Sequence, residues 1–198
     1  MSTSSRETMD NLVFVVQKHK AKTLHYDFRL EVGGVMPSWS IPKGPTLDSG
    51  VKRLAIPTED HALEYRQFEG VIPEDQYGAG PVMIWDEGTY TPVEETSERI
   101  RKDMTERTAA EAAMREGLQE GKVTFHLSGT KLRGLFTLLR LRSAGKKATW
   151  LLLKHHDEYA IQGYDANVYD FSAVSHRSLA EIAMQCAPPD DYRRDMPH

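Results

Sequence analysis

The residues best suited to chemistry in this sequence lie between His19 and Arg29. His19, His25 and Asp27 offer two imidazole nitrogens and one carboxylate oxygen. Two nitrogens and one oxygen, with other positions left open, suit manganese, iron or zinc better than calcium, which prefers oxygen ligands. Arg29 follows closely, and its planar guanidinium can grip a phosphate through two parallel hydrogen bonds. The pattern therefore indicates a divalent metal beside an anion-binding arginine.

One β-strand must carry most of these residues. Polar and apolar residues alternate from residue 25 to residue 31, and a period of two is typical of a half-buried strand. The apolar side consists of Tyr26, Phe28 and Leu30. We expect that side in the core and the metal-binding side on an open face. A strand over residues 12–17 is expected to deliver His19 from an adjoining turn.

Three further residues add positive charge or a proton donor. Lys43 lies in a rigid loop between proline and glycine, and Arg53 begins a short expected strand. His61 follows Glu59 and Asp60, whose carboxylates are expected to raise its pKa and suit it to general-acid or phosphate-donor work. Phosphoryl transfer requires such a combination, because its charged transition state must be neutralised and positioned.

The composition is that of an ordinary soluble globular protein. The 198 residues are 27% charged and 39% hydrophobic, enough for one domain with a substantial core. No apolar run reaches transmembrane length, and the first residues lead to no signal-like segment. Cys186 is the single cysteine, which excludes an internal disulfide framework and a thiolate-rich zinc site. We therefore expect a cytoplasmic monomer without membrane contact.

The distribution of charge is more informative than the net charge of -4. Residues 122–154 contain eight Lys or Arg residues and no Asp or Glu, whereas acidic residues predominate before them. This segregation predicts a basic face that binds a nucleic-acid backbone; a solvated strand face is the alternative. The expected contact residues are Lys122, Lys131, Arg133 and Lys154.

Many short strand patterns, Gly and Pro turns and few helical patterns predict the fold class. We expect a mainly β (α+β) protein with a compact β-barrel-like core and peripheral short helices. A hairpin turn is expected at Asp86-Glu87-Gly88, and a capping box at Ser178–Glu181 predicts a short helix. The expected organisation is a disordered segment at 1–11, one domain over 12–183 with a helical insertion at about 94–120, and a frayed tail at 184–198.

Several multi-residue runs carry a resemblance to a known family. They include Leu24-His25-Tyr26-Asp27-Phe28-Arg29-Leu30-Glu31, Ser38-Trp39-Ser40-Ile41-Pro42-Lys43-Gly44-Pro45, Glu59-Asp60-His61-Ala62-Leu63-Glu64-Tyr65 and Tyr77-Gly78-Ala79-Gly80. With these runs in order, most of residues 12–183 resembles the 3'-phosphoesterase domain of bacterial DNA ligase D and its stand-alone relatives.

The resemblance implies a β-barrel-like enzyme that heals 3' ends of primer-template DNA during repair. It implies removal of 3'-phosphates and 3'-terminal ribonucleotides, with manganese as the cofactor (zinc or cobalt as alternatives), and a separate ligase or polymerase as partner. By position, the metal ligands are His19, His25 and Asp27. Phosphate-binding or catalytic positions are Arg29, Lys43, Arg53, His61 and Tyr65, and supporting ones are Gln17 and Glu59.

Two alternatives stay open at this point. The family carries basic and acidic residues for ribonucleotide trimming before its first strand, whereas residues 1–10 hold only Arg6, Glu7 and Asp10. A catalytically silent DNA-end-binding module is therefore one alternative. The other is a non-haem iron oxygenase, because two histidines and a carboxylate also form that type of iron site.

Overall fold

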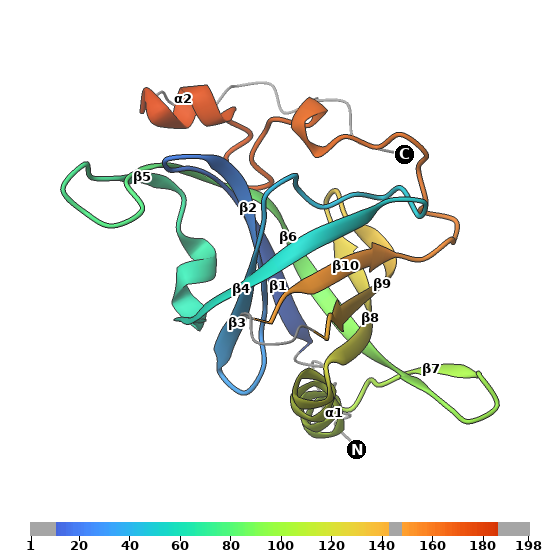
Figure 1. The fold of residues 1–198 in the computed structure, drawn as a ribbon. Coiled ribbons are helices and arrows are strands. Elements are labelled where there is room, and N and C mark those ends of the chain that lie inside the picture. The colour runs from blue at the N-terminus through green and yellow to red at the C-terminus, as the bar shows by residue number, and fades with distance from the viewer. Residues whose placement is uncertain (1–10, 143–147, 186–198) are drawn as a thin grey trace, which may run out of the picture.

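The computed structural model describes residues 11–142 and 148–185, and its strands curl into a closed antiparallel barrel (Figure 1). The ring follows the order β1-β2-β3-β4-β10-β9-β8-β6, and pairing of β6 with β1 closes it. Its strands are β1 (Leu12–Lys20), β2 (Leu24–Leu30), β3 (Val35–Ile41), β4 (Lys52–Ala62), β6 (Gly80–Glu95), β8 (Lys122–Gly129), β9 (Arg133–Arg140) and β10 (Trp150–Lys154). The expected mainly β fold with a barrel-like core is confirmed.

The inside of the barrel is filled by the apolar sides of its strands. Tyr26, Phe28 and Leu30 of β2 are each at most 1% exposed, as their alternation predicts. Phe28 stacks on Phe125 of β8 across the interior, with ring centroids 6.1 Å apart. Because successive strand residues point to opposite faces, the polar side of β2 lies on the outer surface of the barrel.

The expected turn at residues 86–88 does not exist, because β6 runs unbroken through it. The buried Asp86 carboxylate instead accepts hydrogen bonds of 2.7–3.0 Å from the backbone N–H groups of residues 130–132. A Cβ at Gly88 would lie 2.1 Å from the carbonyl oxygen of Ser128. Asp86 and Gly88 thus allow β6 to pack closely against β8 and the loop that follows it. They do not form a turn.

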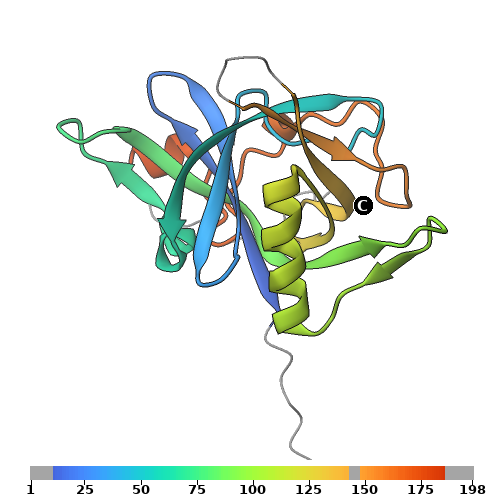
Figure 2. The same ribbon diagram turned by 60° about the horizontal axis from the view of Figure 1, so that its bottom comes forward.

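The helical insertion begins later than the expected 94–120. Residues 93–95 pair with β7 (Arg101–Asp103), and the helix α1 spans Arg107–Glu120. The Glu106 side chain accepts hydrogen bonds from the N–H groups of Thr108 and Ala109, which fixes the helix start there. Figure 2 shows α1 against the barrel and the β6–β7 hairpin extending away from it.

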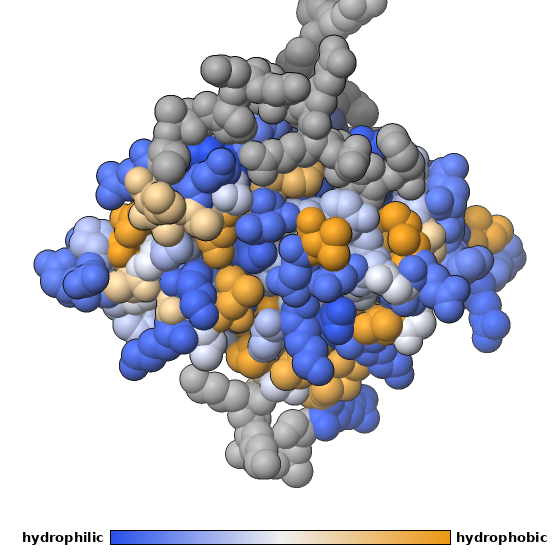
Figure 3. Space-filling view, turned by 90° about the horizontal axis from the view of Figure 1, so that it is seen from above, coloured by the Kyte–Doolittle hydropathy of each residue, from blue (hydrophilic) through white to orange (hydrophobic). Residues whose placement is uncertain are grey.

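The remaining elements lie at the edges of the barrel. They are η1 (Leu63–Gln67), β5 (Gly70–Ile72), η2 (Ala166–Val168) and α2 (Leu179–Ala183). The capping box at Ser178 and Glu181 is present as predicted and opens α2. Seen from the side on which α2 lies, apolar side chains are scattered among hydrophilic ones (Figure 3). No helix in the described ranges is long and apolar enough to cross a membrane. The predictions for 1–11 and 184–198 fall almost wholly outside those ranges.

Candidate metal centre

The hairpin of β1 and β2 brings the predicted metal ligands together. Its antiparallel register places His19 opposite His25 and Gln17 opposite Asp27. Side chains of paired residues lie on the same face of a sheet. His19 thus lies within β1 and not in an adjoining turn as expected, and strand pairing puts it on the same outer face as His25 and Asp27, with the two imidazole centroids 4.9 Å apart.

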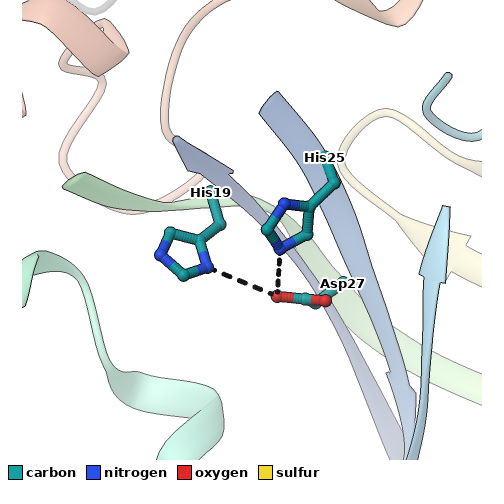
Figure 4. Close-up of side chains that lie close together, drawn as sticks. All are labelled: His19, His25 and Asp27. Carbon is teal, nitrogen blue, oxygen red and sulfur yellow. Dashed lines mark ion pairs between the residues drawn. The ribbon is translucent and has the colours of Figure 1, made fainter. Parts of the chain in front are cut away.

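The three side chains converge on one point, as Figure 4 shows. The Oδ2 atom of Asp27 lies 3.4 Å from Nε2 of His25 and 3.8 Å from Nδ1 of His19. One ligand atom from each residue lies within 4.8 Å of the others. His19 and Asp27 are buried and His25 is half-buried, so the group is shielded but reachable from one side.

Backbone carbonyls orient both imidazoles for metal binding. Nε2 of His19 lies 2.7 Å from the carbonyl oxygen of Gly78, and Nδ1 of His25 lies 3.1 Å from that of Thr23. A carbonyl oxygen can only accept, so each of these nitrogens must carry the proton. In the neutral ring the opposite nitrogen then presents a lone pair toward Asp27, and only in the doubly protonated ring does that nitrogen donate a hydrogen bond to the carboxylate. This arrangement is typical of metal-binding histidines and fits a divalent ion.

The electrostatics keep the Asp27 carboxylate ionised. Burial opposes its charge, but hydrogen bonds from His19 and His25 and the charge of Arg29 outweigh burial and hold the pKa of Asp27 well below its usual range. The hydrogen bond to Asp27 raises the pKa of His25 against the effect of burial. An ionised carboxylate between two imidazoles supplies the ligands and the negative charge that a divalent cation needs.

The Arg29 side chain contacts both the metal group and the residues next to it. Its side chain is nearly inaccessible, with the residue 3% exposed. Nε donates a 2.8 Å hydrogen bond to Oε1 of Gln17, and Nη2 lies 3.4 Å from Asp27. Nη1 lies 3.1 Å from Nδ1 of His61, and the guanidinium carbon lies 5.2 Å from the Tyr65 ring centroid. The structure thus brings five predicted residues into one network.

Gln17 anchors the short helix η1 to this network. Its Nε2 donates 3.0 Å hydrogen bonds to the carbonyl oxygens of Tyr65 and Phe68. The Tyr65 ring contacts both the His61 ring, with centroids 4.9 Å apart, and the Phe68 ring, with centroids 5.5 Å apart. Gln17 therefore fixes both the Arg29 side chain and the backbone that carries the Tyr65 and Phe68 rings.

The pKa of His61 is shifted opposite to the expected direction. Burial and the charge of Arg29 lower it, and the hydrogen bond to the Glu59 backbone carbonyl and the charges of Asp27 and Glu59 offset them only in part. Glu59 contacts the ring through its carbonyl oxygen, 2.9 Å from Nδ1, while its side chain lies exposed. The sequence neighbours of His61 suggested an acidic setting, whereas the folded chain places a guanidinium beside it.

Lys43 and Arg53 differ in their relation to the metal group. Ile41 pairs with Tyr26, so the loop that holds exposed Lys43 begins beside His25. Arg53 lies on the same side of β4 as fully buried Ala55, toward the barrel interior, and its buried Nε lacks a hydrogen-bond partner among the described residues. Among the residues that the structure describes, Arg53 makes no contact with the metal group.

Two of the four predicted DNA-contact residues are inside the protein, which corrects that expectation. Lys131 is 1% exposed, and its Nζ donates to the carbonyl oxygens of Trp85 and, at 2.7 Å, Phe171. Burial lowers the pKa of Lys131 to about 8. Lys154 is 4% exposed and donates a 2.5 Å hydrogen bond to Asp157. Their amines are engaged internally, away from any nucleic-acid backbone.

The other two predicted DNA-contact residues, Lys122 and Arg133, are exposed, but they lie on β8 and β9, on the part of the ring away from β2. Residues 143–147, which hold two more lysines of the basic stretch, fall outside the described ranges. Sequence reasoning missed two exposed lysines, Lys20 and Lys22, at the turn that joins β1 to β2. Their signal was available, because both lie between His19 and His25 in the sequence.

Comparison with known proteins gives a consistent result. Residues 17–140 match the protein family described as the DNA Ligase D 3'-phosphoesterase domain. This range contains the whole metal group and the Arg29 network.

Individual relatives are similar over the same region. The chain is 46% identical over 146 residues to the multifunctional non-homologous end joining protein LigD of Pseudomonas aeruginosa, which covers 74% of the chain and 15% of that protein. It is 41% identical over 138 residues to the LigD of Mycobacterium tuberculosis, covering 70% of the chain and 16% of the relative. It is 36% identical over 152 residues to the LigD of Mycolicibacterium smegmatis, covering 77% of the chain and 18% of the relative. The chain thus spans less than a fifth of the length of these relatives.

Proposed function

Because the chain belongs to the DNA ligase D 3'-phosphoesterase domain family, we propose that it hydrolyses phosphate from the 3' ends of DNA with the help of a divalent metal. The observation that carries this proposal is the position of Arg29, which contacts Asp27 of the metal group and His61 together. A guanidinium at that point suits a phosphate that reaches from the metal position to the histidine.

The metal we propose is manganese, held by His19, His25 and Asp27, with zinc and cobalt as alternatives. Two nitrogens and one oxygen leave coordination positions for substrate and water, and they suit these ions better than calcium. When bound, such an ion supplies Lewis-acid polarisation of a phosphoryl oxygen and neutralises its charge.

Arg29 has the role of stabilising negative charge on the phosphoryl group. Its orientation is set in advance by Gln17 and by the Tyr65 ring, so the guanidinium needs little reorganisation when charge develops. Its low exposure strengthens this effect, because water screens a buried charge less.

His61 has the role of hydrogen-bonding the phosphate or the leaving 3' oxygen. Its Nδ1 faces Nη1 of Arg29, which can only donate, and the Glu59 carbonyl oxygen, which can only accept, so it bonds to one of them at a time. In either case Nε2 is left as the ring nitrogen for the substrate. The lowered pKa favours the neutral ring at pH 7. Neutral imidazole carries one proton and one lone pair, so His61 serves as donor or acceptor without adding a fixed charge.

The DNA backbone is proposed to run along the β1–β2 turn and the Lys43 loop. Lys20, Lys22 and Lys43 are exposed there, and the first two lie between His19 and His25 in the sequence. We further propose that the protein acts as a cytoplasmic monomer together with a ligase or polymerase of an end-joining system, because the named relatives are non-homologous end joining proteins.

The test is an end-healing assay with purified protein, manganese and a 3'-phosphate primer-template. Phosphate release that is lost in His25→Ala supports the proposal, and a second primer with a 3'-terminal ribonucleotide tests the trimming reaction. Tight binding to DNA ends with no phosphate release under any divalent metal would favour the silent end-binding module. Oxygen consumption that depends on iron would favour the oxygenase instead.

A further inference from the structure

The loop between β5 and β6 leans against the metal group and carries a protruding aromatic residue. The Gly78 carbonyl oxygen accepts the 2.7 Å hydrogen bond from Nε2 of His19. The preceding residue, Tyr77, is fully exposed, at 104% of the reference area. Consecutive Cα atoms are about 3.8 Å apart, so the Tyr77 backbone lies within one residue of a group that orients a metal ligand.

Glycines hold this loop close to the end of β1. Gly78 has a φ of +77°, a conformation that favours glycine. A Cβ at Gly80 would lie 2.0 Å from the carbonyl oxygen of Lys20. The backbone N–H of Gln76 donates a 3.0 Å hydrogen bond to the Pro73 carbonyl, which closes a turn just before Tyr77. The ring is thus presented outward by a backbone packed against the metal-binding hairpin.

The charge of the loop determines what it can bind. Residues 73–80 contain Glu74 and Asp75 and no basic residue, and both carboxylates are exposed. Such a loop repels backbone phosphates, so a DNA contact here must go to an uncharged group. The faces of nucleobases are uncharged and stack well on tyrosine, largely without regard to sequence.

We propose that Tyr77 is a stacking platform for the base of the nucleotide that carries the 3'-phosphate. This inference rests on the proposed function and adds a nucleoside subsite to it. The base is only a few covalent bonds from the 3'-phosphate, which fits the short separation of Tyr77 from the metal group. Only the last nucleotide of a strand has no neighbour on its 3' side, so one face of its base is free to receive the ring. Tyr77 would thereby distinguish a strand end from an internal phosphate.

Phosphate-release kinetics test this subsite with Tyr77→Ala, Tyr77→Phe and Tyr159→Ala. Tyr159 is a matched control, an exposed tyrosine beyond β10 on another part of the surface. Loss of one stacking contact should raise KM for the 3'-phosphate primer-template roughly 5- to 150-fold in Tyr77→Ala. Tyr77→Phe keeps the ring and should restore the wild-type KM, and the control should match the wild type throughout.

A primer whose last nucleotide is abasic allows removal of the ring and removal of the base to be compared singly and together. The wild type should show a similar rise in KM on this primer, and Tyr77→Ala should lose little more, because the stacking partner is already absent. An unchanged KM in Tyr77→Ala, or an equal loss on normal and abasic primers, would overturn the proposal. An unchanged KM would leave the exposed ring better suited to contact with a protein.

A binding measurement separates this inference from the proposed function. With 2-aminopurine as the 3'-terminal base, stacking on Tyr77 should quench fluorescence in the wild type and in Tyr77→Phe, and not in Tyr77→Ala. If the wild type releases no phosphate but this pattern holds, the subsite stands and the proposed reaction fails. Equal fluorescence in all three proteins would refute the subsite whatever the catalytic result.

Discussion

Two regions of this protein are rich in polar and charged residues, and they use them in opposite ways. On the β1–β2 hairpin, residues 17–29 turn their polar side to the outer surface of the barrel, where His19, His25 and Asp27 converge. Across β8–β10, residues 122–154 contain more positive charge, yet Lys131 and Lys154 point inward and bind carbonyl or carboxylate groups. The first region keeps its ligand atoms directed at one another, whereas in the second the amines of Lys131 and Lys154 are hydrogen-bonded inside the protein.

The difference shows that direction and partners decide the role of a charged residue. Lys154 shares the inward side of β10 with Trp150 and Leu152, so strand alternation alone predicts its burial. Arg29 is equally buried, but it lies on the outer side of β2 with Asp27, next to a surface that a substrate can reach. A count of charges cannot distinguish these two settings.

The largest expected effect separates the two regions by metal binding. His25→Ala or Asp27→Ala removes one of three ligands and should lower phosphate release at least about 100-fold, with loss of bound manganese. Lys154→Met should leave the metal content unchanged. Metal analysis of the purified proteins and phosphate-release assays check this. Full metal content and activity in both ligand variants would refute the assignment of the metal group.

The next effect concerns the arginine beside the metal group. Arg29→Ala should lower kcat/KM roughly 100- to 1,000-fold, because a preorganised cation next to the phosphoryl group is lost. Arg29→Lys should recover little, since an ammonium cannot make the paired hydrogen bonds of a guanidinium to Gln17 and a phosphate. Steady-state kinetics with manganese content held equal measure both. Recovery to near wild-type activity in Arg29→Lys would show that only a positive charge is needed.

The sequence alone was sufficient to predict the side of the barrel on which the metal group lies. The alternation over residues 25–31 predicts which side chains of β2 face outward, and a hairpin with a short turn brings His19 to His25. These inferences succeed because they depend on neighbours in the chain. The fold class also follows, since local strand and turn patterns determine it.

Long-range pairing explains what the sequence did not reveal. The turn expected at residues 86–88 fails because Asp86 binds backbone groups more than forty positions away. The lowered pKa of His61 depends on its burial and on Arg29 from another strand. The side of β4 to which Arg53 points depends on the pairing of β4 with β10. Such partners have no signature in the residues that flank them.

A third prediction tests the structural role of Lys131. Lys131→Met should lower the free energy of unfolding by about 1–3 kcal/mol, because the carbonyl oxygens of Trp85 and Phe171 lose their donor. The metal binding of the Lys131→Met variant should stay unchanged. Denaturant unfolding of both proteins measures this, and DNA binding that falls while stability holds would contradict the buried role.

The same variant has an expected pH dependence. The folded pKa of Lys131 is about 8, below its ordinary value of 10.5. Between these values the unfolded chain binds more protons at this residue, so the wild type gains stability as pH rises through that range. The stability of wild type relative to Lys131→Met should therefore increase from pH 8 to pH 10. A constant difference across that range would show that the pKa of Lys131 is not lowered.

The smallest expected effect compares the exposed lysines of the two regions. Lys22→Ala should raise KM for the primer-template a few-fold at low salt, and should reduce the salt dependence of binding by about one phosphate contact. Lys122→Ala should change neither, because Lys122 lies 3.8 Å from Glu95 on the part of the ring away from β2. Binding titrations over a series of salt concentrations measure both slopes. A reduced slope in Lys122→Ala with an unchanged slope in Lys22→Ala would move the DNA path to β8, and would restore the role predicted from the charge of residues 122–154.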